Sequence, residues 1–144
     1  MLAEANKELV RRFFEDMNRG EDGVLDRYLS PDIVCYVGGM PEPVRGLEMN
    51  KQMDAAFHSA FSNIRYTVEG IVAEGDTIAV RRTWSMKHTG TFMGIDPTNK
   101  ELTGTAMDFM RIADGKIVEQ WSESDNLTFM QQLGALPASE HGGI

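Results

Sequence analysis

Residues 64–88 read IRYTVEGIVAEGDTIAVRRTWSMKH, and this stretch decides the fold class. Strand-forming residues lie on both sides of Glu74-Gly75-Asp76, which is a typical turn sequence. The pattern predicts two antiparallel strands, over residues 64–73 and 77–88. A sheet is therefore expected in the second half of the chain.

A second hairpin is predicted further along, where Asp114-Gly115 joins residues 102–112 to residues 116–125. The first half has helical periodicity instead. Apolar residues recur at helical spacing over residues 7–17 and 46–61, and charged residues occupy the other face of the first of these helices. Shorter helices are predicted over residues 24–29 and 127–133, and a short strand over residues 33–37.

Helices followed by consecutive hairpins predict an α+β domain, because no crossover helices remain to build a parallel sheet. Four helices cannot cover both faces of a strongly bent sheet, so we expect them to close its concave face into a pocket. Residues 1–137 are expected to form this single domain, and residues 138–144 a loose tail. Four phenylalanines are expected to pack the helices onto the sheet: Phe13, Phe14, Phe57 and Phe61.

Composition excludes several function classes. The chain has 144 residues, and 22 acidic against 14 basic side chains give a net charge of −8, which opposes binding to nucleic acid and to anionic membranes. The lone Cys35 allows no intramolecular disulfide, and the three histidines are too far apart for a local metal-ligand pair. No nucleotide-binding motif, signal peptide or membrane span is recognisable. We expect a cytoplasmic protein without metal or cofactor.

The last predicted strand carries candidate catalytic carboxylates. If Ile112 faces Ile117 across the turn, Asp108 lies beside Trp121 and Met110 beside Glu119 on one face, unless a bulge breaks this register. A carboxylate next to an aromatic side chain on a mostly apolar face is typical of a general base with a raised pKa. In the alternative interpretation Trp121 is a core residue, and Asp108 and Asp125 accept structural hydrogen bonds.

The preceding strand places four side chains on one face: Arg82, Trp84, Met86 and His88. His88 is a candidate for moving a proton or holding a carbonyl oxygen, although a structural hydrogen bond explains it equally well. Tyr36 is a candidate hydrogen-bond donor to a ligand, or an anchor at the end of a core strand. Cys35 has no activating neighbour in the sequence and is expected to be inert.

The order and spacing of several motifs resemble a known family over residues 6–134. The resemblance rests on Asn6-Lys7-Glu8-Leu9-Val10-Arg11-Arg12-Phe13-Phe14, Asn18-Arg19-Gly20, Leu29-Ser30-Pro31-Asp32-Ile33-Val34, Arg45-Gly46, His88-Thr89-Gly90-Thr91-Phe92-Met93-Gly94-Ile95-Asp96-Pro97-Thr98, and Asp114-Gly115-Lys116-Ile117-Val118-Glu119-Gln120-Trp121 followed by Asp125. The chain is thereby identified as similar to the SnoaL-like polyketide cyclases, in the nuclear transport factor 2-like superfamily. The resemblance implies a cone-shaped α+β roll with an apolar cavity, a homodimer formed through the outer sheet face, and no cofactor or metal.

The resemblance also implies site residues. The cyclases of this family use an aspartate near the end of the last long strand as acid and base in an intramolecular aldol closure, and Asp125 occupies the matching position. The sequence departs from the family pattern where Tyr36 and Gln120 replace frequent histidines and Arg82 replaces a frequent tryptophan. With Asp125 and His88 as the catalytic residues, the expected substrate-binding residues are Tyr36, Arg82, Trp84, Asp108, Met110 and Trp121.

Three functions remain open on the sequence. The first is a cyclase or isomerase acting on a small apolar carbonyl compound in an internal cavity. The second is a pocket that sequesters a hydrophobic metabolite without catalysis. The third is an epoxide hydrolase in which Asp108 and Asp125 share a water molecule. The fold alone does not choose among them.

Overall fold

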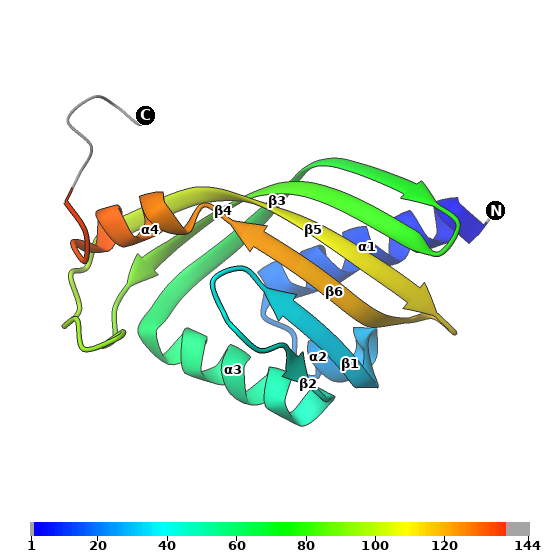
Figure 1. The fold of residues 1–144 in the computed structure, drawn as a ribbon, viewed down its shortest axis with the longest axis horizontal. Helices are drawn as coiled ribbons and strands as arrows, with labels where there is room; N and C mark the ends of the chain where they lie inside the picture. Colours follow the sequence, from blue (N-terminus) through cyan, green and yellow to red (C-terminus); the bar gives the residue numbers. More distant parts are fainter. Residues whose placement is uncertain (1, 138–144) are drawn as a thin grey trace.

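The computed structural model describes residues 2–137, and the predicted tail over residues 138–144 lies outside the described residues. Six strands form one curved, unclosed sheet in the order β2-β1-β6-β5-β4-β3 (Figure 1). The strands are β1 (Leu29–Val37), β2 (Val44–Arg45), β3 (Phe61–Glu74), β4 (Thr77–His88), β5 (Glu101–Ala113) and β6 (Lys116–Ser124). The predicted α+β class is confirmed.

Neighbouring strands are antiparallel except β1 and β6, which run parallel. The hairpins β3–β4 and β5–β6 follow the predicted turns at residues 74–76 and 114–115. The predicted hairpins are antiparallel, whereas β1 departs from this pattern, because no tight turn connects it to β6 and the hairpin pattern therefore does not determine its direction.

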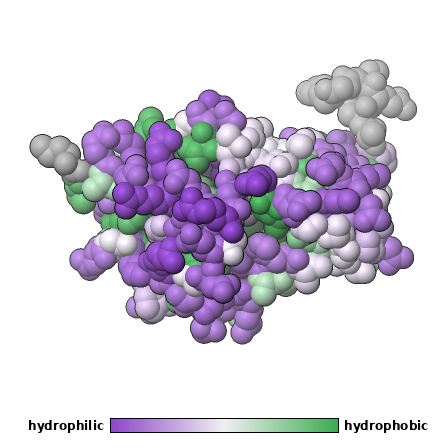
Figure 2. Space-filling model, turned by 180° about the vertical axis from the view of Figure 1, so that it is seen from behind, coloured by the Kyte–Doolittle hydropathy of each residue, from purple (hydrophilic) through white to green (hydrophobic). Residues whose placement is uncertain are grey.

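The helices are α1 (Leu2–Arg19), α2 (Val24–Tyr28), α3 (Leu47–Ala60) and α4 (Asn126–Leu133). Helix α1 crosses behind the strands in Figure 1, α3 runs along the β1 side of the sheet, and α4 packs against β5. The molecule seen from behind is mainly hydrophilic, with hydrophobic residues in small separate areas (Figure 2). Within residues 2–137, no helix is both long and apolar enough to span a membrane.

Aromatic side chains hold the helices on the concave face of the sheet. The Phe14 ring lies 5.7 Å from the ring of Tyr66 on β3, and Phe57 on α3 lies 4.7 Å from Phe61. Phe13, Phe14 and Phe61 are buried and Phe57 is half-buried, so the predicted packing of these phenylalanines is confirmed. Edge-to-face and tilted rings of this kind stabilise the core beyond the area that they bury.

Strand β4 shows the two faces of the sheet most clearly. Its burial alternates along the strand, with even-numbered residues on the inner face and odd-numbered residues on the outer face. The inner positions include Arg82, Trp84, Met86 and His88, as predicted. The face to which a β4 or β5 side chain belongs therefore follows from the number of its residue.

Candidate functional site

A cavity of about 220 Å³ lies on the concave face, where β3, β4 and β6 meet α3 and α4. We call it the inner cavity. Its wall is mostly apolar, and three of the nine lining residues are aromatic rings of Phe or Trp. The lining residues are Val37, Phe57, Tyr66, Arg82, Trp84, Met86, Ser124, Asn126 and Phe129.

Strand β4 supplies three of these residues: Arg82, Trp84 and Met86. The indole ring of Trp84 packs on its cross-strand partner Gly104. The contact is so close that a methyl group on Gly104 would come within 2.3 Å of the ring. The predicted binding roles of Arg82 and Trp84 stay predictions, and the structure places both side chains at the cavity wall.

The Arg82 guanidinium is held from behind by Asp108. Arg82 Nε donates to Asp108 Oδ2 at 2.5 Å, and Nη2 donates to Oδ1 at 3.2 Å and to Ser122 Oγ at 3.4 Å. The guanidinium carbon also lies 5.5 Å from the Phe14 ring and 5.2 Å from the Tyr66 ring, in cation–π geometry. These contacts fix the guanidinium plane and leave Nη1 without a partner among residues 2–137.

Asp108 itself does not face the inner cavity. Its side chain has no exposed surface, and its oxygens accept from Arg82 and, at 3.4 Å, from Gln120 Nε2. The negative charge of Asp108 is therefore paired with the positive charge of Arg82 inside the protein. The epoxide hydrolase alternative needs Asp108 and Asp125 to share a water molecule, and the structure does not favour it, because the Asp108 carboxylate is sealed and Asp125 is exposed.

The predicted register of β5 and β6 is wrong beyond the first pair. Ile112 pairs with Ile117 as predicted, but Arg111 pairs with Glu119, so Val118 is an extra residue that forms a bulge. Asp108 therefore lies opposite Ser122 rather than Trp121, and Met110 lies opposite Gln120 rather than Glu119. One extra residue moves every later side chain of β6 to the other face.

As a result, Trp121 and Tyr36 lie on the outer face, where their rings stack 5.3 Å apart and almost parallel. They do not line the inner cavity, and their expected role in substrate binding stays a prediction. Met110 is on the correct face, but it is completely buried in the core beneath the helices.

Asp125 is the exposed N-cap residue of α4. Its carboxylate accepts a hydrogen bond from the Thr128 hydroxyl at 2.7 Å and from the Thr128 N–H at 3.1 Å. These hydrogen bonds, of which the one from the Thr128 hydroxyl has the larger effect, hold the pKa of Asp125 below its ordinary value. The expected raised pKa is therefore wrong. Its neighbours Ser124 and Asn126 line the inner cavity, but Asp125 does not.

His88 is completely buried and anchors the loop between β4 and β5. Its Nδ1 lies 3.0 Å from Thr98 Oγ1 and accepts the Thr98 N–H at 3.2 Å. The imidazole lies 5.3 Å from the Phe61 ring, and Nε2 has no partner among residues 2–137. His88 is not among the residues that line the inner cavity, which favours the structural interpretation.

The sequence reasoning missed Tyr66 and Asp54. Tyr66 precedes the β3–β4 turn on an inner position, and its phenol lines the inner cavity. Burial raises the pKa of Tyr66, with Asp54 and Asp108 adding to the rise and Arg82 opposing it. Tyr66 and Val68 are two residues apart on β3 and therefore lie on the same face, and the residues between and beside them are exposed. This alternation could have indicated that Tyr66 points inward.

Asp54 lies on α3, three residues before the cavity-lining Phe57, and 35% of its side chain is exposed. Desolvation raises the pKa of Asp54, and the nearby His58 opposes this rise. Asp54 also lines a groove between α3 and the α1–α2 connection. The Asp54 carboxylate is therefore only partly buried, and it is close enough for its charge to raise the pKa of Tyr66.

Cys35 lies on β1, where it pairs with Gln120 of β6. Burial, together with the charge of Asp108, raises the pKa of its thiol to about 11. The thiol is therefore protonated at neutral pH and a poor nucleophile, as expected. Among residues 2–137, no group of three or more His, Cys, Asp or Glu side chains is arranged to hold a metal ion.

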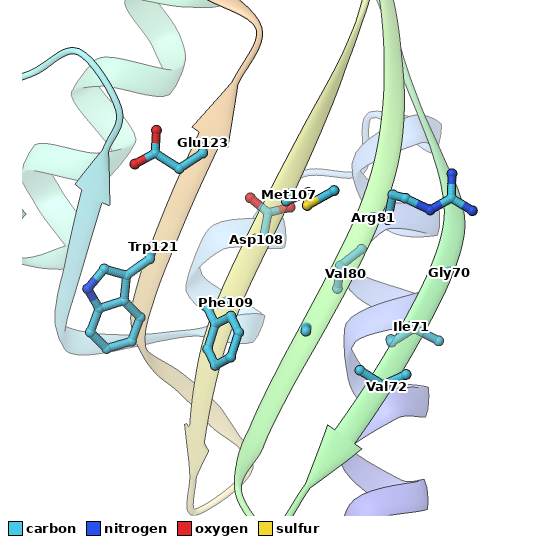
Figure 3. Close-up of a pocket in the computed structure, with 11 residues that line it drawn as sticks. Gly70, Ile71, Val72, Val80, Arg81, Met107, Asp108, Phe109, Trp121 and Glu123 are labelled. Atoms are coloured by element: carbon cyan, nitrogen blue, oxygen red, sulfur yellow. The ribbon is translucent and has the colours of Figure 1, made fainter.

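A second hollow, the outer groove, lies on the convex sheet face and measures about 410 Å³. Figure 3 shows Trp121 of β6 and Phe109 of β5 side by side at one end, with Ile71 and Val72 of β3 at the other. Trp121 is 40% exposed and Phe109 53%. Side chains this apolar and this exposed are typical of a surface that binds another protein.

Comparisons with known proteins agree with this architecture. Residues 8–133 match the family model of the SnoaL-like polyketide cyclases. The chain belongs to this family. Among individual members, aklanonic acid methyl ester cyclase DauD of Streptomyces sp. (strain C5) is 29% identical over 133 residues, which cover 88% of this chain and 80% of DauD.

Two solved structures superpose on most of this chain. AclR of Streptomyces galilaeus, for which a hydroxylase activity has been suggested, is 31% identical with a TM-score of 0.82 and covers 95% of this chain and 85% of AclR. IdmH of Streptomyces antibioticus, for which a polyketide cyclase activity has been suggested, is 30% identical with a TM-score of 0.77 and covers 90% of this chain and 98% of IdmH. The resemblance expected from the motifs is confirmed.

Proposed function

We propose that this SnoaL-like protein is a cofactor-independent cyclase or isomerase of the intramolecular aldol type, acting on an apolar carbonyl compound in the inner cavity. One observation carries the proposal: the Arg82 side chain, whose guanidinium is fixed by Asp108, lines a mostly apolar cavity. Such a preorganised donor stabilises charge that develops on a carbonyl oxygen. The cytoplasmic location stays a prediction.

The chemistry needs one base and one donor. The base removes a proton from the carbon between two carbonyl groups, and the resulting enolate carbon attacks a third carbonyl of the same molecule. A carbon–carbon bond forms, the attacked oxygen becomes an alkoxide, and the proton returns to that oxygen. The product has the mass of the substrate. The cavity contributes by holding the two reacting carbons close together.

We assign the base to Asp54 rather than Asp125. Asp54 is not among the residues that line the inner cavity, but it precedes the cavity-lining Phe57 by three residues on α3, and desolvation raises its pKa. Asp125 is engaged twice by Thr128, and its pKa is lowered. A carboxylate with a higher pKa is the better base for a carbon acid at neutral pH.

An assay for ring closure without a change in molecular mass tests this function. Purified protein is incubated with aklanonic acid methyl ester and with a smaller aryl triketone, and ring-closed product of unchanged mass is separated by chromatography. We expect turnover of at least one compound, and Asp54→Asn should lower kcat by about 10²- to 10⁴-fold. Asp125→Asn is the matched control. Loss of turnover in that variant alone would return the base to Asp125.

A non-catalytic binding pocket is the second candidate. It is favoured by the absence of a carboxylate among the nine residues that line the inner cavity. Tight binding of both compounds without product, in wild type as in Asp54→Asn, would establish this function and overturn the cyclase proposal.

We further propose that the outer groove is buried in a homodimer. The apolar residues of this face are exposed from 36% to 66%, and charges of both signs lie among them, so the surface can pair with a copy of itself. The exposed residues are Tyr36, Val72, Met107, Phe109 and Trp121.

Phe109→Asp is expected to convert the dimer into a monomer, because a carboxylate in the centre of an apolar interface loses its hydration. Light scattering after gel filtration measures the mass against the 16.1 kDa of one chain. Met93→Asp, at an exposed loop position, is the matched control and should remain dimeric. A wild-type monomer at micromolar concentration would contradict the proposal.

A further inference from the structure

The connection between β4 and β5 lies at the same end of the molecule as α4 (Figure 1). It contains a small hairpin, in which the Phe92 N–H donates to the Ile95 carbonyl at 2.9 Å and the Ile95 N–H donates to the Phe92 carbonyl at 2.8 Å. Met93 and Gly94 at its tip both have a positive φ, which is typical of a tight two-residue turn. Residues 91–97 therefore contain a unit with hydrogen bonds of its own.

This segment is fixed to the protein only at its two ends. Within the part of the chain that the structure describes, residues 91–97 make no hydrogen bond to any residue outside the segment. On one side the Gly90 N–H donates to the Ala60 carbonyl at 2.9 Å, and on the other the Thr98 N–H donates to His88 Nδ1 at 3.2 Å. Movement of the segment about these two ends would therefore break apolar contacts only.

The apolar contacts of the segment centre on Phe92, which is half-buried. Its ring lies 6.3 Å from the Phe57 ring on α3 and 5.8 Å from the Phe129 ring on α4, in both cases edge-to-face. Phe57 and Phe129 line the inner cavity, whereas Phe92 does not, so Phe92 supports both rings from outside the cavity. One side chain of the segment thus bridges two helices that enclose the cavity.

The same arrangement leaves one buried donor unsatisfied. His88 Nδ1 accepts the Thr98 N–H, so the proton of the neutral imidazole is on Nε2. Among residues 2–137, this Nε2 is the only buried side-chain nitrogen or oxygen without a hydrogen-bond partner. The imidazole packs on Phe61, which in turn contacts Phe92 at 5.0 Å. Because an unpaired buried donor costs free energy, the closed packing around it is less stable than a fully paired one.

We propose that residues 91–97 form a flap that opens and closes the inner cavity, with Gly90 and Thr98 as its hinges and Phe92 as its latch. Gly90 suits a hinge packed on α3, because a methyl group there would come within 2.1 Å of the Ser59 carbonyl oxygen. A ligand enters when Phe92 withdraws from the two cavity-lining rings. The inference goes beyond the proposed function, since it concerns access to the cavity and not the reaction inside it.

Quenching of Trp84 fluorescence by acrylamide tests the flap without any knowledge of the natural ligand. The chain has two tryptophans, and Trp121→Phe removes the one on the outer face, so the remaining signal comes from the cavity wall. Trp84 is only 6% exposed, and acrylamide must enter the protein to reach it. In this background Phe92→Ala should raise the quenching constant, measured from fluorescence lifetimes, by about threefold to tenfold, because the aromatic latch is lost.

Two hinge variants distinguish an opening flap from a hole left by the missing ring. Gly90→Ala displaces one hinge, and Thr98→Val removes the hydroxyl that lies 3.0 Å from His88 Nδ1 at the other. Both keep every aromatic ring in place. Each should raise the quenching constant of Trp84 by about twofold or more, because a weakened hinge increases the open population.

Two further variants are matched controls. Met93→Ala changes a side chain of the same flap that is 71% exposed and does not hold it closed. Gly70→Ala adds a methyl group to a glycine of β3 where the nearest atoms are 3.8 Å away. Both should leave the quenching constant unchanged.

Each other outcome contradicts a part of the proposal. Unchanged quenching in Phe92→Ala and in both hinge variants would overturn the flap, and so would a rise in Phe92→Ala alone, which would leave Phe92 as a packing residue. A rise in the hinge variants alone would overturn the assignment of Phe92 as the latch. An equal rise in both controls would indicate general loosening and overturn the flap. The ring-closure experiment decides the proposed reaction separately.

Discussion

Asp108→Ala should destabilise the protein by about 3–5 kcal/mol, because it leaves the Arg82 guanidinium charged, buried and without its two strongest acceptors. Neither side chain has more than a tenth of its surface in contact with solvent. Water therefore cannot replace the lost carboxylate. Urea unfolding measures the effect as a large fall in midpoint with little change in slope.

Two further variants make this result specific. Arg82→Met combined with Asp108→Leu replaces the pair by apolar groups and should restore most of the stability, since a buried pair contributes little over a well-packed apolar pair. Glu119→Ala breaks the Arg111–Glu119 pair on the outer face of β5 and β6, where the side chains are 42% and 28% exposed. It should cost less than about 1 kcal/mol. An Asp108→Ala protein as stable as Glu119→Ala would contradict the account of the buried pair.

Gly104→Ala should close the inner cavity. The added methyl group would lie within 2.3 Å of the Trp84 ring, so the indole must leave the sheet, and the inner cavity is the adjacent space. Because the ring then occupies part of the 220 Å³, we expect the affinity for a small apolar ketone, for which α-tetralone serves as the probe, to fall by about 10- to 100-fold.

Gly70→Ala is the matched control. The nearest atoms to a methyl group at this position are 3.8 Å away, on the Arg81 side chain, and the backbone needs no special conformation. This variant should bind α-tetralone as wild type does. If Gly104→Ala kept wild-type affinity while its thermal midpoint fell, the strain would be relieved elsewhere and Trp84 would not border the ligand.

The correct part of the site prediction concerns β4. Arg82, Trp84 and Met86 line the inner cavity because the strand is regular over its whole inner row, so the period of two residues assigns every side chain to a face. The incorrect part concerns β6. The bulge at Val118 places Trp121 outside, and no residue type in the Lys116-Ile117-Val118-Glu119 sequence indicates an extra residue.

Asp125 illustrates a local signal that was available. An aspartate three residues before a threonine, at the start of an apolar helical segment, is typical of an N-cap. The structure confirms this arrangement through both Thr128 contacts. The capping interpretation would have indicated a lowered pKa, because hydrogen bonds to a carboxylate favour its charged form.

The sequence by itself determined the elements, the two hairpins, the α+β class and the family, because turn residues and hydrophobic periodicity act over a few neighbouring positions. The tertiary structure alone decided which polar side chains meet. Arg82 and Asp108 are 26 residues apart, and their pairing depends on the register between β4 and β5. The inner cavity likewise depends on α3 and α4 closing over the curved sheet, and such long-range packing leaves no periodic signal in the chain.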